Sequence, residues 1–497
     1  MPPSADSRAQ SSVYDSATKS NASPEPFGAG TPGERSALMA LSPLDGRYAR
    51  QTEALSHYFA EFGLMRYRFA VEIEWLIFAL TKLQLPNAPS LEDAQIALFR
   101  TWTDAFAESD ARQIKAIERT TRHDVKAVEY VVRERLSKSG HEHLAPYVHL
   151  CCTSEDINNI SHALMLRDGL QSVWLPALDE VLAQLVRLAK ESLHDPMLAR
   201  THGQAASPTT LGKELAVFVQ RLRRQRSLLT NQAYLTKFSG AVGNYNAHAA
   251  AYPDVNWPKA ARDFIDVFGL AQNPITTQIE PHDYMAEVFH ALARTNAILI
   301  DLDRDMWTYI SLGYLKQKVY AGEVGSSTMP HKVNPIDFEN SEANAGLSTA
   351  ILDHLALKLP ISRMQRDLSD SSAIRTVGTG IGHSLLALKG CLAGLKKVDV
   401  DRTALRADLD RNWAVLGEAI QTILRKHGVE DAYERIKAAT QAQDLDGAAL
   451  RQIVEQANIP EPDRTRLMEM SPSSYIGLAV DVAMPILDDS DHPEGAT

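Results

Sequence analysis

The chain has 497 residues, of which 44% are hydrophobic and 23% are charged, and its formal net charge is −11. A chain of this length is expected to form two or three domains, and its composition is ordinary for a soluble globular protein. The negative charge argues against nucleic acid or an anionic membrane surface as a general partner. It remains compatible with a local basic pocket for a small anion.

The cysteine and histidine content gives no sign of a disulfide framework or a metal site. Cys151, Cys152 and Cys391 form no Cys-x-x-Cys pair, which fits a reducing cytoplasm. The segment "GHEHL" at 140–144 lacks the His-Glu-x-x-His order of a zinc site, so we expect no metal there. No apolar run reaches the ~18 residues that a membrane span needs, so we expect no membrane partner.

The two ends of the chain are polar. Residues 1–38 are dominated by Ser, Pro, Ala and Gly and contain no apolar core of a secretory signal. Such a segment cannot bury enough surface to offset the entropy of ordering it, so we predict a disordered extension. Met39 is an alternative start. Residues 490–497 are predicted to be a polar tail.

From about residue 42 the hydrophobic pattern is helical, and no alternating strand run is evident. The segment "TSEDINNISHALML" predicts a helix start, because Thr153 or Ser154 can act as N-cap. Glu155 and Asp156 suit the positive end of the helix dipole. Further along, Pro176 is expected to kink the helix or to mark a break.

Two more long helices are predicted in the middle of the chain. One runs from Pro208 to about Lys237, with Ser207 as its cap. The other runs from Tyr284 to Lys318, which is roughly 50 Å at the usual rise per residue. The basic run "RLRRQR" at 221–226 favours a solvated face or an intersubunit strip of salt bridges over nucleic-acid binding.

These patterns predict an all-α fold with three helical domains. They are an N-terminal domain at 39–142, a central bundle of long helices at 143–395 and a C-terminal domain at 396–489. Helices of this length usually bury their apolar stripes against partner subunits. We therefore expect the central bundle to form the core of a homotetramer.

The stretch "GEVGSSTMPHKVNPIDFENSEANAG", Gly322–Gly346, carries the chemistry. Its glycine-containing loop leads into a helix from Ile336, and the N–H groups at such a junction favour anions. Lys332 and Asn334 add a positive charge and an amide donor. A serine beside them can act as a nucleophile or as a general base. The Gly-x-Ser-x-Gly elbow of a nucleophilic serine is not present.

This stretch resembles the signature of the fumarase/aspartase superfamily, and within it the adenylosuccinate lyase family in its longer bacterial form. The resemblance extends from Leu41 to about residue 485. It is carried by "LSPLDGRY" (41–48), "ERTTRHDVKAVEY" (118–130), "CTSEDINNISHALML" (152–166), "RTHGQAASPTTLGKE" (200–214), "NPITTQIEPHDY" (273–284), the signature itself and "RMQRDLSDSSAIR" (363–375).

The resemblance implies an all-α homotetramer whose active sites each take segments from three subunits, with no cofactor and no metal. The implied substrates are succinylated purine nucleotides. Adenylosuccinate would be cleaved to AMP, and the succinylated imidazole-carboxamide ribotide to its free carboxamide, each with release of fumarate.

The same resemblance assigns His202 as general acid and Ser326 as general base. Physical reasoning alone does not rank Ser326 above Ser327. The residues that the resemblance assigns to substrate binding are Arg47, Tyr48, Arg122, His123, Asp124, Thr153, Ser154, Gln278, Ser327, Lys332, Val333, Asn334, Asn340, Arg366, Ser371 and Arg375.

Several of these assignments have a plain structural alternative. Arg122 stands where some relatives carry Asn, which leaves its direct role open beside that of a solvated charge. Thr153 and Ser154 can cap a helix and bind a carboxylate at once. His202 on its own is equally a histidine satisfied in a loop.

Three other functions remain as alternatives. One is another superfamily member, such as a 3-carboxymuconate cycloisomerase, which shares a Met-Pro-His-Lys string. The second is a non-catalytic structural protein on the same fold, against which the presence of His202, Ser326, Lys332 and Asn334 argues. The third is a serine hydrolase, for which no elbow and no recognisable His-Asp partner set is present.

Overall fold

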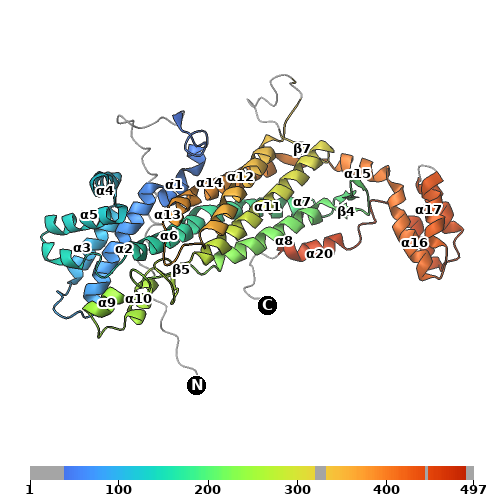
Figure 1. The fold of residues 1–497 in the computed structure, drawn as a ribbon. Coiled ribbons are helices and arrows are strands. Elements are labelled where there is room, and N and C mark those ends of the chain that lie inside the picture. Colours follow the sequence, from blue (N-terminus) through green and yellow to red (C-terminus); the bar gives the residue numbers. More distant parts are fainter. Residues whose placement is uncertain (1–38, 319–328, 330–331, 443–445, 489–497) are drawn as a thin grey trace. The chain divides into compact units, whose positions relative to one another are not determined.

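The structure, a computed structural model, describes residues 39–318, 329, 332–442 and 446–488 (Figure 1). The predicted N-terminal extension and polar tail lie outside the described residues. So do Ser326 and Ser327 of the signature stretch, together with His331.

Helices dominate the described chain, which confirms the predicted all-α fold. The α-helices of the first half are α1 (Ala49–Phe59), α2 (Glu61–Lys82), α3 (Asp93–Asp104), α4 (Glu108–Thr121), α5 (Asp124–Lys138), α6 (Ser154–Gly169), α7 (Leu175–Glu191), α8 (Leu211–Thr230), α9 (Asn246–Ala251) and α10 (Trp257–Asp266). Those of the second half are α11 (Asp283–Ser311), α12 (Ile336–Lys358), α13 (Ser369–Ala373), α14 (Val377–Lys397), α15 (Arg402–Asp410), α16 (Gly417–Lys426), α17 (Ala432–Ala442), α18 (Gly447–Glu455), α19 (Glu461–Glu469) and α20 (Ala479–Asp488).

The strands are two or three residues long and occur in pairs. Antiparallel pairs are formed by β1 (Pro196–Met197) with β4 (Thr209–Thr210), by β2 (Arg200–Thr201) with β3 (Gln204–Ala205), and by β7 (Leu315–Gln317) with β8 (Val398–Val400); β5 (Leu235–Thr236) pairs in parallel with β6 (Ala271–Gln272). Each pair is a separate two-stranded sheet, and no larger sheet is present among the described residues.

The chain divides into two compact units. The first comprises Met1–Pro176, Leu228–Arg294 and Leu347–Leu386, and the second comprises Ala177–Ser227, Thr295–Gly346 and Ala387–Thr497.

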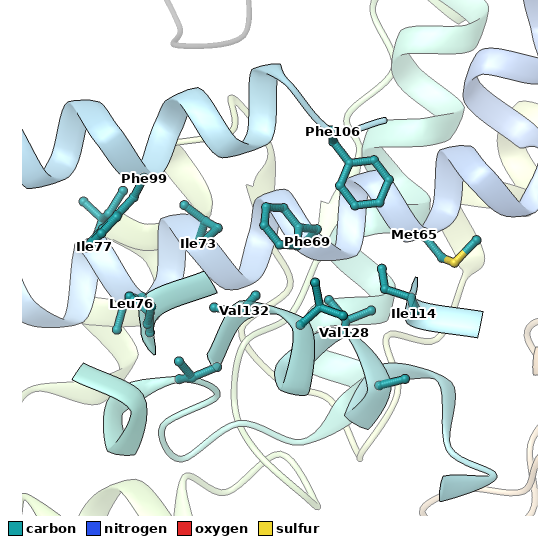
Figure 2. Close-up of a cluster of buried hydrophobic side chains, with 14 of the residues drawn as sticks. Met65, Phe69, Ile73, Leu76, Ile77, Phe99, Phe106, Ile114, Val128 and Val132 are labelled. Carbon is teal, nitrogen blue, oxygen red and sulfur yellow. The ribbon is translucent and has the colours of Figure 1, made fainter. Parts of the chain in front are cut away.

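In the first unit, α2 supplies the centre of a hydrophobic core (Figure 2). Phe69, Ile73 and Leu76 of this helix are fully buried against side chains of α3, α4 and α5, among them Phe99 and Val132. Each such side chain contributes about 1.5–3 kcal/mol by leaving water. Because α2 is apolar on nearly every side, the charged residues within it must find partners.

In the second unit, the C-terminal helices build a smaller core. Figure 1 shows α16 and α17 side by side, and Ile420 and Leu424 of α16 pack there with Leu450 and Val454 of α18. Among the described residues, no helix is both long enough and apolar enough to cross a membrane.

The predicted start of α6 is confirmed. Thr153 is the N-cap, and its backbone N–H donates to the Asp156 carboxylate at 2.8 Å in a capping box. Pro176 was predicted to kink the helix or to mark a break, and the α-helix is interrupted just before it. A π-helical turn at Leu170–Trp174 joins α6 to α7, and Pro176 occupies the first turn of α7, where its missing N–H is tolerated.

The predicted bounds of α8 and α11 are wrong. The cap of α8 is Thr210 in place of Ser207, because the Thr210 hydroxyl accepts the Lys213 N–H at 3.2 Å. Pro208 precedes β4 and is not helical, and α8 ends at Thr230, short of Lys237. The helix α11 ends at Ser311, where Gly313 turns the chain into β7 with a φ of +76°.

The basic run on α8 forms ion pairs within its own unit. Arg221 pairs with Asp301 of α11, and Arg226 makes a bidentate pair with Asp179 of α7 at 2.5 and 3.0 Å. These ion pairs give two arginines of the run partners within the protein, so nucleic acid is not needed to explain them.

Candidate active site

In the first unit, the predicted "RHD" residues form the corner between α4 and α5. Arg122 ends α4 in the left-handed region with a φ of +52°. His123 is the N-cap of α5, and its Nδ1 accepts the Lys126 N–H at 3.2 Å. Asp124 is the first helical residue. This corner leaves Arg122 and His123 exposed and Asp124 half-buried.

Asp124 lies between two arginines from distant parts of the chain. The buried Arg68 of α2 approaches its Oδ2 at 2.9 Å, and Arg375 approaches the same oxygen at 3.1 Å. Burial alone would raise the pKa of the Asp124 carboxyl, but Arg68 and Arg375 help to hold it below its usual value. Arg375 also pairs with Glu61 at 2.6 Å. Two predicted binding residues are therefore in direct contact.

A second cluster gathers at the N-terminus of α6. Glu155, next to the predicted Ser154, accepts from Arg366 at 3.0 Å. Arg366 also donates to the side-chain oxygen of Gln278 at 3.1 Å, and Gln278 donates to the Ala241 carbonyl at 2.8 Å. The end of this helix, with its Thr153 and Ser154 hydroxyls, is thus held beside a cation and an amide.

Asn158 joins the two clusters into one network. Its amide donates to Glu155 Oε1 at 2.7 Å, and its oxygen accepts from Arg68 Nε at 2.8 Å. A continuous chain of contacts therefore runs from Gln278 through Arg366 to Arg375. Arginines, helix N–H groups and hydroxyls of this kind favour an anionic ligand.

The remaining predicted residues of the first unit occupy the starts of two helices. Tyr48 is the N-cap residue of α1, and the exposed Arg47 guanidinium lies 5.7 Å from the centre of its ring. Ser371 lies in α13 beside Asp370. The buried ring of His282 approaches that carboxylate at 3.9 Å.

In the second unit, His202 occupies the tip of the β2–β3 hairpin. His202 and Gly203 are its two turn residues, with φ of +53° and +75°. Positive φ at both positions is the mark of the type I′ turn that suits two-residue hairpins. The His202 side chain is exposed. The turn therefore leaves the imidazole accessible to solvent.

The described part of the signature stretch leads into α12. Lys332 and Val333 are exposed just before this helix, and the Val333 carbonyl accepts from Gln317 of β7 at 2.8 Å. Asn334 is half-buried. Asn340 lies within α12, and its backbone carbonyl accepts a hydrogen bond from the side-chain amide of Asn344. The Ser326 and Ser327 assignments lie outside the described residues and stay predictions.

Metal ligation has no geometric support in the parts of the chain that are described. No group of three or more His, Cys, Asp or Glu side chains there is arranged to hold an ion.

Comparison with known proteins gives this arrangement a family. A family described as "Lyase" matches residues 46–348, and one described as "Adenylosuccinate lyase C-terminal" matches residues 362–476. The adenylosuccinate lyase of Vibrio cholerae serotype O1 is 50% identical over 451 residues, which cover 90% of this chain and 99% of that protein. The chain belongs to the adenylosuccinate lyase family. The family resemblance predicted from the sequence is confirmed, and the chain is a lyase.

Further relatives agree. The adenylosuccinate lyase of Escherichia coli K12 is 48% identical over 448 residues, covering 90% of this chain and 98% of that protein. Two solved structures share the fold of this adenylosuccinate lyase family member. They are a 3-carboxy-cis,cis-muconate lactonizing enzyme from Pseudomonas putida (TM-score 0.69, 21% identity, 88% of this chain and 96% of that one) and a fumarate lyase from Mesorhizobium sp. BNC1 (TM-score 0.71, 20% identity, 88% and 97%).

Sequence reasoning missed residues of the network that contacts the predicted binding arginines of this family member. Glu61, Arg68 and Asn158 were not predicted, and Glu155 was interpreted only as a helix-dipole residue. A usable signal was the run "RYRFAVEIEWLIFAL", in which charges interrupt a helix that is otherwise apolar. A charge on such a helix is expected to be buried and paired.

Proposed function

We propose that this lyase eliminates fumarate from adenylosuccinate, giving AMP, and from the succinylated aminoimidazole carboxamide ribotide, giving AICAR, in purine nucleotide biosynthesis. The observation that carries the proposal is the 50% identity to a curated adenylosuccinate lyase over 90% of the chain. The network of Gln278, Arg366 and Arg375 supports it, since a substrate with a phosphate and two carboxylates needs several cations.

The proposed chemistry needs one base and one acid. The Ser326 oxygen removes the proton from the carbon next to a succinyl carboxylate, and the carbanion electrons are held as an aci-carboxylate. Lys332 and Asn334 are the described donors that suit this charge. The carbon–nitrogen bond then breaks, the carbon–carbon double bond of fumarate forms, and His202 gives its proton to the departing nitrogen.

The proposal includes the assembly and the location. The active sites of a homotetramer would each combine segments of several subunits, and the enzyme would work in the cytoplasm without cofactor or metal. The likeness to a muconate lactonizing enzyme, at 21% identity, concerns the fold. It does not favour that reaction over the one named by the relatives of 48–50% identity.

The test is direct. We expect purified protein, in the presence of EDTA, to convert adenylosuccinate to AMP and fumarate, followed by the ultraviolet spectrum and by a fumarate assay. A parallel incubation with 3-carboxy-cis,cis-muconate is expected to show no turnover. Absence of fumarate, or complete dependence on an added divalent ion, would overturn the proposal.

A further inference from the structure

A fully buried ion pair lies beneath the N-terminus of α6. Lys237 Nζ is 2.8 Å from Asp156 Oδ1, and both side chains are 0% exposed. Neither residue belongs to the predicted binding set. Taking two charges out of water costs several kcal/mol per ion, which is repaid only when the geometry is good and the remaining polar atoms are satisfied.

The Asp156 carboxylate meets that condition by binding two separate backbone segments. It accepts the N–H of Thr153 at 2.8 Å, and the N–H groups of Ser239 and Gly240 at 2.9 and 3.1 Å. Lys237 Nζ donates in turn to the Gly240 carbonyl at 2.9 Å. One carboxylate therefore ties the turn before α6 to the loop that follows β5.

Asn159 fixes the backbone of Lys237 from the other side. Its side-chain oxygen accepts the Lys237 N–H at 2.8 Å, and its amide donates to the Lys237 carbonyl at 2.9 Å. The cation is thus held at both its backbone and its ammonium group, so the pair has little freedom to adjust.

The loop held in this way continues into the binding network. The carbonyl of Ala241 accepts from Gln278 at 2.8 Å. Gly243 has a φ of +82°, and a Cβ added there would lie 2.1 Å from the Thr276 carbonyl oxygen. The loop and the segment carrying Gln278 are therefore packed so closely that a shift in one moves the other.

We propose that Asp156 and Lys237 are positioning residues that hold the Thr153–Ser154 turn and Gln278 in the geometry that binds a succinyl carboxylate. This inference rests on the proposed function. The pair itself touches no substrate. It acts by placing the hydroxyls, the helix N-terminus and the amide that do.

Energetics separates this role from general stability. Replacing a buried ion pair with neutral side chains of similar size is often harmless to folding, whereas removing one partner leaves an uncompensated charge. The double variant Asp156→Asn/Lys237→Met is therefore expected to fold. An amide has one oxygen to offer where the carboxylate has two, so the variant cannot hold both the turn and the loop.

The test uses inhibition by the two products. In the double variant we expect the KM for adenylosuccinate and the inhibition constant of fumarate to rise about tenfold or more, the scale of losing hydrogen bonds to a charged group. The inhibition constant of AMP is expected to stay within about twofold of wild type. Circular dichroism and thermal melting report on folding. A general structural defect would weaken fumarate and AMP together.

A control is the ion pair between Arg100 of α3 and Glu74 of α2, at 2.9 and 3.0 Å, neither of which is a predicted binding residue. The variant Glu74→Gln/Arg100→Met is expected to leave all three constants unchanged. A second route is Asn159→Ser, which loosens Lys237 without removing a charge. It should raise the same two constants.

The outcomes divide cleanly. If the folded double variant keeps the wild-type KM for adenylosuccinate and the wild-type inhibition constant of fumarate, the positioning role is wrong. It is also wrong if the inhibition constant of AMP rises in parallel with that of fumarate. If the double variant does not fold, unchanged constants in Asn159→Ser would overturn it instead. A wild-type protein that releases no fumarate would refute the proposed function, and this baseline is measured first.

Discussion

At the scale of single residues, His202 stands in an unusual conformation. A type I′ turn favours Asn, Asp or Gly, and histidine is one of the few other residues enriched at positive φ. This chain places an imidazole there, with φ of +53°, next to Gly203. The same chain has positive φ at other non-glycine residues, among them Gln84 and His149. The turn leaves the His202 imidazole exposed, and its role as the general acid stays a prediction.

We predict that His202→Asn lowers kcat for adenylosuccinate by about 10²–10⁴, the usual scale of losing acid–base catalysis. Asn suits the left-handed region, so the thermal melting temperature should stay close to that of wild type. His202→Ala should lose the same activity. If a folded His202→Asn protein keeps a near-normal kcat, His202 is not the general acid and is only a residue of the loop.

The residue scale also shows where sequence reasoning ends. Motif matching named Asp124, Arg366 and Arg375, and the structure brings each of them into one network. Motif matching did not name the partners of these three residues, because tertiary packing determines them. Arg375 pairs with Glu61, which lies 314 positions earlier in the chain. No local pattern encodes a contact across such a separation.

At the scale of elements, local signals fixed some helix ends and misplaced others. The string "TSED" predicted α6 correctly because its capping box is contained in four consecutive residues. Ser207 and Pro208 carry an equally good local signal, yet the pairing of β4 with β1 shifts the cap to Thr210. Strands of two residues are too short for any periodicity to reveal. A strand pairing therefore explains the shifted cap of α8, whereas α11 ends at the local turn of Gly313.

A buried carboxylic acid lies among three helices of the second unit. Asp303 of α11 is 1% exposed and lies beside Ser341 of α12 and Cys391 of α14, which are both fully buried. Neither carboxylate oxygen has a hydrogen bond of normal geometry. Burial raises the pKa of the Asp303 carboxyl to about 8.

We predict that Asp303 makes the folded protein less stable as pH rises. Its folded pKa lies above the unfolded value of about 3.9, so the folded state holds the extra proton between these values. The stabilisation is fully present below about pH 4 and is lost as pH rises through about 8. Asp303→Asn cannot ionise. Its melting temperature relative to wild type should therefore increase from pH 5 to pH 8.

The same experiment has a clear contrary result. Thermal melts of wild type and Asp303→Asn that run parallel across this pH range would show that the carboxyl titrates normally. Asp301 of the same helix, which pairs with Arg221 near the surface, offers a control. The Asp301→Asn protein should show no comparable trend.

At the scale of the whole molecule, the single chain leaves large apolar side chains in contact with water. Trp307 is 45% exposed, Leu347 54% and Leu357 69%, on the long helices α11 and α12, and Val482 of α20 is 56% exposed. Exposed apolar surface often marks a contact with another protein. We therefore expect the central helices to associate, as the predicted homotetramer requires.

Assembly matters to the chemistry because the proposed active site draws on several subunits. We predict that His202→Asn and Ser326→Ala, each nearly inactive alone, regain activity when their chains are mixed, dissociated and reassembled. A mixed tetramer would contain some sites with both an intact acid and an intact base. Light scattering on the eluted protein should give about four times the chain mass of 54.8 kDa.

The control for reassembly is a mixture of His202→Asn with His202→Ala, in which every site lacks the acid. This mixture should stay inactive although it assembles equally well. Differently tagged chains, purified through both tags in turn, establish that the active species is mixed. If the His202 and Ser326 variants co-assemble and no activity returns, each site takes its acid and its base from the same chain. The proposal of shared sites would then be wrong. The assignment of His202 as acid and Ser326 as base would still be supported by the loss of kcat in each single variant.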